Sequence, residues 1–135
     1  GMQIDRGYLS PHFVNNPAKL SVEMLNPYIL LYDGKISVMN DLIPILEEIS
    51  KDRASLMIIA EDVEGEALSN LVMNNLNGVI NVCAIKAPGF GDERNEILQD
   101  LAILTGGTLI SQDKGLLLED TTLDMLGSCD KIITE

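Results

Sequence analysis

Residues 58–68 read IIAEDVEGEAL, a stretch that passes directly from an apolar run into a helical pattern. Residues 55–60 form the apolar run and predict a buried strand, since short apolar runs bounded by polar residues are typical of parallel sheets. Residues 64–77 predict the helix that follows, with Gly78 placed at its C-terminal cap. This strand-to-helix unit is the pattern from which an α/β fold is built.

The same pattern continues on both sides of this unit. A strand is predicted at 27–32, ending in a turn at Asp33 and Gly34, and a helix at 39–50 with Pro44 in its first turn. Downstream, strands are predicted at 79–84, 108–110, 116–118 and 131–134, and helices at 93–104, capped by Asp92, and at 123–126. The alternation predicts a single α/β domain with a partly parallel sheet, and the opening third, divided by proline, glycine and asparagine, predicts extra β structure on one side.

The helix predicted at 64–77 carries more apolar surface than one-sided packing can bury. At about 100° per residue its apolar positions spread over about 240°, whereas a helix packed on one side buries little more than about 100°. Ala67 and Leu71 are assigned to the core, whereas Leu68, Val72 and Met73 fit either the core or the surface. Apolar side chains left in water commonly bind a partner.

The helix predicted at 39–50 shows the same excess more weakly. Its core positions are Leu42, Ile45 and Ile49, and Ile43 and Leu46 lie off the centre of that face. In the helix predicted at 93–104, one apolar face is expected to collect Ile97, Leu98, Leu101 and Leu104.

Composition excludes several classes of partner. The chain has 135 residues and a net charge of -12, without a basic cluster, so nucleic acid is not an expected partner. Neither a signal peptide nor an apolar run of about 20 residues is present, so no membrane association is expected. Cys83 and Cys129 are expected to be reduced thiols, and the chain reads as a soluble domain of a reducing compartment, a piece of a larger protein.

Two motifs have a chemical and a structural interpretation. The acids Glu61, Asp62, Glu64 and Glu66 could form a metal-dependent catalytic cluster, but they also complement the dipole of a helix N-terminus. The sequence at 89–92, GFGD, could cradle an anion, but it lacks the remaining residues of a nucleotide-binding loop and fits a tight turn before a helix. No nucleophile or metal-binding motif accompanies the single histidine, so an enzyme is not expected.

Several long strings resemble the apical domain of the group I (GroEL-type, 60 kDa) chaperonins. These strings, in family order, are DRGYLSP at 5–11, IIAEDVEGEAL at 58–68, AIKAPGFGD at 84–92, LQD at 98–100 and LTGG at 104–107. The resemblance covers the whole of residues 1–135. It implies a layered β/β/α fold with a mixed sheet flanked by helices, and it implies that the family's equatorial ATPase and intermediate domains are absent from this chain.

The resemblance also implies a function. It implies a chaperone module that assists folding by binding exposed hydrophobic segments of non-native proteins, and the mobile loop of a GroES-type co-chaperonin, in a groove between two helices. By position, this binding site consists of Tyr8, His12, Phe13, Ile43, Leu46, Leu68, Val72 and Met73. A groove already filled by the chain's own residues, with a purely structural role, is the alternative.

Further implications concern cofactors and assembly. No cofactor is expected in this fragment, whereas the full-length family protein would use ATP and Mg²⁺ as an ATPase. The fragment is expected to be a monomer, and the full-length protein a heptameric ring of the bacterial cytoplasm or an organelle matrix. The chain departs from the family at His12, where an aromatic residue is common, at Asn77, where a basic one is common, and in the acidic stretch 92–96. His12 would make the extended segment more polar and sensitive to pH, whereas Asn77 and the acidic stretch put the family's salt bridges between neighbouring apical domains in question.

Overall fold

The computed structural model describes residues 2–4, 13, 15 and 22–134. Its centre is a sheet in the order β5-β4-β3-β6, built from parallel strands. The strands are β3 (Tyr28–Ile36), β4 (Ser55–Val63), β5 (Asn81–Lys86) and β6 (Leu109–Ile110), and β7 (Gly127–Ser128) pairs antiparallel with the start of β3. The central residues of β3, β4 and β5 are buried on both faces, which explains why these strands read as continuous apolar runs.

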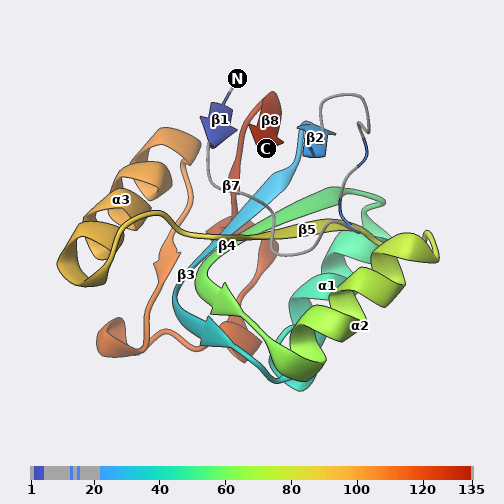
Figure 1. Cartoon of the computed structure of the whole chain (residues 1–135), viewed down its shortest axis with the longest axis horizontal. Helices are drawn as coiled ribbons and strands as arrows, with labels where there is room; N and C mark the ends of the chain where they lie inside the picture. The colour runs from blue at the N-terminus through green and yellow to red at the C-terminus, as the bar shows by residue number, and fades with distance from the viewer. Residues whose placement is uncertain (1, 5–12, 14, 16–21, 135) are drawn as a thin grey trace.

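Helices cover both faces of this sheet (Figure 1). α1 (Ile43–Lys51) and α2 (Gly65–Leu76) lie side by side on one face, and α3 (Gly91–Thr105) lies on the other. A 3₁₀ turn, η2 (Met39–Asp41), leads into α1, whose first turn contains Pro44 as predicted. Gly106, with a φ of 74°, ends α3 in the left-handed region that favours glycine.

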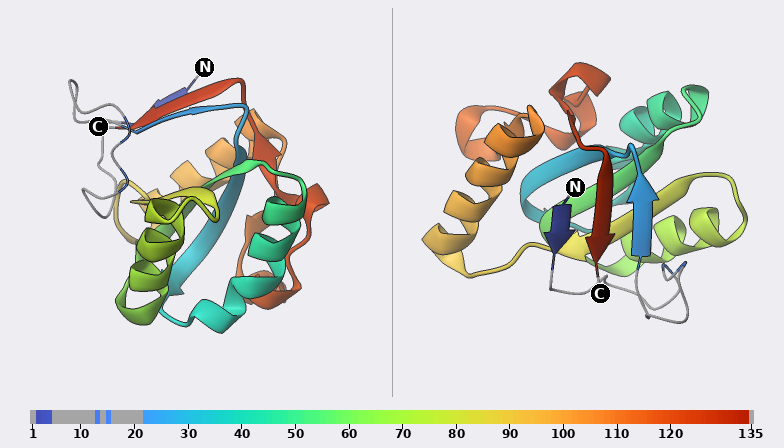
Figure 2. Two further views of the ribbon diagram at one scale, coloured as in Figure 1. Left: turned by 90° about the vertical axis from the view of Figure 1, so that its right-hand side faces the viewer. Right: turned by 90° about the horizontal axis from the view of Figure 1, so that it is seen from above.

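A second, smaller sheet forms a separate layer. It has the order β1-β8-β2, where β1 (Met2–Ile4) runs parallel and β2 (Val22–Leu25) antiparallel to β8 (Lys131–Thr134). Figure 2 shows this sheet lying across one end of the central sheet, away from the start of α1 and α2. The predictions of a mixed α/β fold, a partly parallel sheet and additional β structure from the opening third are therefore confirmed for the described residues.

The predicted turn at Asp33 and Gly34 is wrong, because β3 continues through it to Ile36. The pairing of β3 with β4 shifts between Tyr32 and Lys35, which marks a β-bulge. A Cβ at Gly34 would lie 2.9 Å from the Tyr32 ring, so glycine leaves room for the ring at the bulge. Asp33 and Gly34, a dipeptide typical of turns, therefore form a bulge within β3 and do not end the strand.

Other local predictions also need correction. The predicted 116–118 strand is absent. The chain there runs from one 3₁₀ turn, η3 (Gln112–Lys114), into another, η4 (Leu118–Asp120). The predicted 123–126 helix is a third 3₁₀ turn, η5 (Leu123–Met125). α3 begins before Asp92, which lies inside the first turn, and Phe90 occupies the N-cap position instead. The buried side of α3 consists of Leu98, Ala102 and Thr105, so Leu104 is 77% exposed. No helix in the described part of the chain is long and apolar enough to cross a membrane.

Candidate binding surface on α1 and α2

The order β3-α1-β4-α2-β5 places α1 and α2 on the same face of the sheet, and hydrogen bonds hold their N-terminal ends together. The backbone N–H of Met39, just before α1, donates to Oε1 of Glu66 in the first turn of α2, at 3.1 Å. The backbone N–H of Glu64 donates to the carbonyl of Ile36, at 2.9 Å. The two helices therefore start from one fixed end of the surface.

The buried face of α1 is wider than the sequence predicted. Leu42, Ile45 and Ile49 are buried as expected, but Leu46, predicted to lie in the binding groove, is only 3% exposed. At about 100° per residue these four side chains span an arc of about 100°, so Leu46 occupies one edge of an ordinary buried face. Ile43, by contrast, is 40% exposed and available for binding.

The excess apolar surface predicted for α2 is present. Ala67 and Leu71 are fully buried, and Leu68 and Val72 are half-buried against the core. Met73 and Leu76 are each 59% exposed. Val79, in the loop after α2, is similarly exposed and was assigned to a strand by the sequence pattern. The exposed residues follow one another at intervals of three along the chain, a spacing that could have indicated this extension.

The side of α2 that faces α1 carries Met73. Glu66, which contacts Met39, and Met73 are two helical turns apart and lie within about 20° of each other around the helix axis. On α1, Ser50 and Ile43 are related by the same spacing, and Ser50 shares a hollow with residues that follow α2. Ile43 and Met73 therefore lie on the facing sides of the two helices.

Leu68 and Val72 lie on the other side of α2. They are within about 60° of Asn75 around the helix axis, and the Oδ1 of Asn75 accepts a hydrogen bond from the backbone N–H of Val82 in β5, at 3.1 Å. The α2 residues predicted to line one groove are thus divided, with Met73 on the α1-facing side of the helix and Leu68 and Val72 on its β5-facing side. We call the set Ile43, Leu68, Val72, Met73, Leu76 and Val79 the helical apolar surface.

The predicted extended segment contributes differently. Phe13 is 2% exposed and belongs to the hydrophobic core, so its side chain is not available to a partner in this structure. Tyr8 and His12 lie outside the described residues. Asn15 is held in place because its side chain exchanges two 2.8 Å hydrogen bonds with the backbone of Glu23 in β2.

A hollow of about 250 Å³ lies where α1 and α2 end. It is lined by the end of α1 and by the loop after α2, including Ser50, Arg53, Ala54, Val79 and Ile80. It places apolar atoms next to one cation at the C-terminal end of the helical apolar surface.

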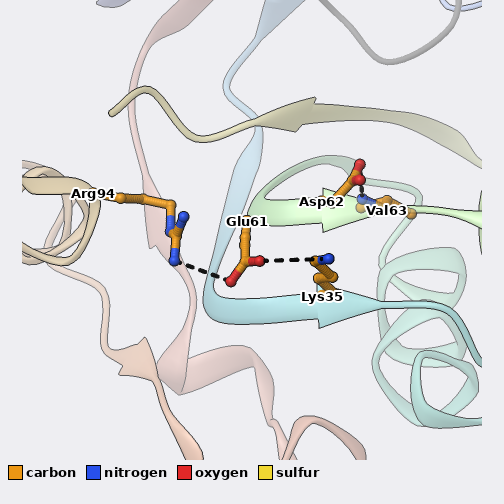
Figure 3. Close-up of polar contacts among 5 residues, drawn as sticks. All are labelled: Lys35, Glu61, Asp62, Val63 and Arg94. Atoms are coloured by element: carbon orange, nitrogen blue, oxygen red, sulfur yellow. Dashed lines mark hydrogen bonds and ion pairs between the residues drawn. The ribbon is translucent and has the colours of Figure 1, made fainter. Parts of the chain in front are cut away.

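The four acids at the end of β4 do not converge. Glu61 forms ion pairs with Arg94, at 3.0 Å, and with Lys35, at 3.9 Å, and thus links β4 to α3 and β3 (Figure 3). Asp62 accepts a hydrogen bond from the backbone N–H of Val63, and Glu66 accepts the one from Met39. Among the residues that the structure describes, no three histidine, cysteine or acidic side chains lie close enough to hold a metal ion.

The loop before α3 has mixed charge. A hollow of about 170 Å³ beside it is lined by Lys35, Lys86 and Arg94, but also by Glu61 and Asp62. Lys35 and Arg94 there are already paired with Glu61, and Phe90, just before α3, is largely exposed. The structural interpretation of the GFGD sequence, a turn that begins a helix, agrees with this geometry.

Neither described thiol is activated for chemistry. Burial raises the pKa of the Cys83 thiol well above its usual range, because the thiolate would be desolvated. Burial also raises the pKa of the Cys129 thiol, against the smaller, opposing effect of a backbone hydrogen bond with Lys131. Both cysteines are free thiols, as expected.

A comparison with protein-family models gives no match to this chain.

Proposed function

We propose that this chain is a polypeptide-binding module of the chaperonin apical type, with the corresponding layered β/β/α fold. The observation that carries the proposal is the helical apolar surface, where aliphatic side chains on two adjacent helices remain in water. The resemblance of five sequence strings to the apical domain supports the same role. Its partners would be non-native proteins and the mobile loop of a GroES-type co-chaperonin.

The chemistry of the surface suits promiscuous binding. Non-native chains expose apolar side chains, and aliphatic groups accept them without hydrogen bonds of fixed geometry. Burying about 300–400 Å² of apolar surface offers several kcal/mol before ordering costs are subtracted. Met73 adds adaptability, because its unbranched side chain fits differently shaped partners. A single site is therefore expected to bind weakly, and a ring of such sites would add avidity.

The test is fluorescence anisotropy of a labelled apolar peptide titrated with the chain. Replacing Ile43 and Met73 by serine should weaken binding by about tenfold or more, since both side chains are exposed on facing sides of α1 and α2. The matched control replaces Ile103 and Leu104, which are more exposed but lie on α3 across the sheet. It should bind like the original chain.

A second pair of substitutions separates the two sides of α2. Leu68→Ser with Val72→Ser tests the β5-facing side, and circular dichroism must show that this variant is folded, because both residues are half-buried. Absence of saturable binding to the original chain, or equal loss in the α3 control, would contradict the proposed function. A self-filled surface with a structural role would then be favoured.

A further inference from the structure

The helical apolar surface has an acidic border. Residues 39–53 and 64–79 contain the acids Asp41, Glu47, Glu48, Asp52, Glu64 and Glu66, but only the basic residues Lys51 and Arg53. Three of these acids face elsewhere. Glu48 lines a hollow with residues of η4 and η5, and Asp52 accepts a hydrogen bond from the Tyr28 hydroxyl. Burial raises the pKa of the Tyr32 hydroxyl, and so do the nearby carboxylates of Asp41 and Glu119, which places Asp41 on the η4 side of α1. The other three remain for the surface between the helices.

Their positions follow from the helix geometry. Glu64 and Glu66 lie at the fixed end where α2 begins, and the hydrogen bond from Met39 to Glu66 joins the two helices there. Glu47 lies one helical turn after Ile43. It is on the exposed side of α1, next to the side that faces α2. Negative charge therefore accompanies the apolar side chains along half of the surface.

Among the residues that the structure describes, little neutralises this charge. The ion pairs found in the described part of the chain both involve Glu61, which lies at the other side of the sheet end, next to α3. Glu47 is exposed, and α2 contains no basic residue between its start and Leu76. Lys51 lies in the last turn of α1 and Arg53 just after the helix, so both are at the far end of the surface.

We propose that the helical apolar surface selects apolar peptide segments flanked by lysine or arginine. The inference rests on the proposed function and specifies its substrate class. A lysine next to an apolar side chain seated between Ile43 and Met73 would gain from the carboxylates of the border, and a glutamate there would be repelled. A second copy of this chain is a poor occupant, because a net charge of -12 on each copy opposes association.

The test compares three labelled peptides that share one apolar core and carry lysine, serine or glutamate on both flanks. At low salt, the lysine peptide should bind about tenfold more tightly than the glutamate peptide, with the serine peptide between them. In about 0.5 M NaCl the difference should fall to about twofold, because salt screens exposed charges.

Matched charge reversals locate the source of the preference. Glu47→Lys should reduce the ratio between lysine and glutamate peptides about threefold or more, since the reversed charge lies beside the bound segment. Glu119→Lys changes the net charge equally, but Glu119 lies in η4, next to the opposite side of α1. The ratio between lysine and glutamate peptides in this variant should therefore stay close to that of the original chain.

The possible failures are distinguishable. Equal effects of the two reversals would assign the preference to overall charge and overturn the local border. Equal binding of all three peptides would also overturn this inference, while leaving the apolar binding function in place. Failure of even the serine peptide to bind would contradict the proposed function itself.

Discussion

Phe13 and Phe90 are the two phenylalanines of the chain, and their environments are opposite. Phe13 is buried in the core, whereas Phe90 is exposed at the start of α3. The resemblance assigns Phe13 to an extended binding segment, but a side chain in the core stabilises the fold before it can contact a partner. Loss of binding in a Phe13 variant would therefore need to be separated from loss of stability.

Phe13→Ala is expected to lower the free energy of unfolding by about 3–5 kcal/mol, because it removes a buried ring and leaves a cavity. Phe90→Ala, the matched control, should change it by less than about 0.5 kcal/mol. Equilibrium denaturation in urea measures both. Equal, small effects would place Phe13 at the surface and restore it to the binding segment.

The two thiols should differ in reactivity. Because burial raises the pKa of Cys83 well above its usual range, the reactive thiolate is nearly absent at pH 8, and a disulfide reagent should modify Cys83 only on unfolding. Cys129, whose pKa is raised while it remains partly accessible, should react in the folded chain more slowly than in denaturant. A Cys129→Ser variant isolates Cys83, and rapid modification of that folded variant would contradict its burial.

At the scale of elements, α1 and α3 show how a helix is oriented by what covers it. In α1 the buried face includes Leu46 at its edge, and in α3 it includes Ala102 and Thr105 instead of Leu104. Periodicity predicts which residues share a side of the helix. It does not predict which of two adjacent rows of apolar side chains packs against the sheet. That choice depends on the strands and turns packed against each helix.

The C-terminal end of α3 provides a test of close packing between elements. A Cβ at Gly127 in β7 would overlap Oγ1 of the buried Thr105 and lie 2.6 Å from its Cβ, whereas one at Gly106 would meet nothing within 4 Å. Gly127→Ala should therefore destabilise the fold by about 2–3 kcal/mol through overpacking. Gly106→Ala, limited to the strain of a φ of 74°, should cost about 1 kcal/mol.

Thermal and urea denaturation of both variants would measure this order. A Gly127 variant as stable as the original chain would mean that β7 and the end of α3 are further apart than in the structure. A Gly106 variant with the larger loss would show that backbone conformation, and not packing, dominates at this junction.

At the scale of the whole molecule, acidic charge opposes compactness. The chain has 21 acidic and 9 basic residues, and Glu61 forms ion pairs with the described residues Lys35 and Arg94. Repulsion among exposed carboxylates should therefore exceed attraction, and screening it should stabilise the folded state.

Raising NaCl from about 20 mM to about 0.5 M is expected to increase Tm by several degrees, because the Debye length falls well below the spacing of most surface charges. Circular dichroism at the same pH, with KCl as the matched salt, measures the effect. A decrease of Tm in both salts would show that favourable charge pairs dominate instead.

Sequence patterns alone were sufficient to predict the α/β class, the order of the main helices and strands, and the core positions Leu42, Ile45, Ile49, Ala67 and Leu71. They also indicated that α2 carries excess apolar surface. These features depend on short-range patterns, because the periods of helix and strand place apolar side chains on one side of an element before any long-range contact forms.

Which apolar side chains remain in water, and what they face, depends on the packing of the complete fold. This packing buried Leu46 and Phe13, carried β3 through a bulge, and divided the predicted site between the α1-facing and β5-facing sides of α2. The exposure and the orientation of a side chain depend on elements that are distant in sequence. The pattern of a helix specifies the positions of its side chains relative to one another around the helix axis. Packing against the sheet and the neighbouring helix determines which of those side chains face the core and which face water.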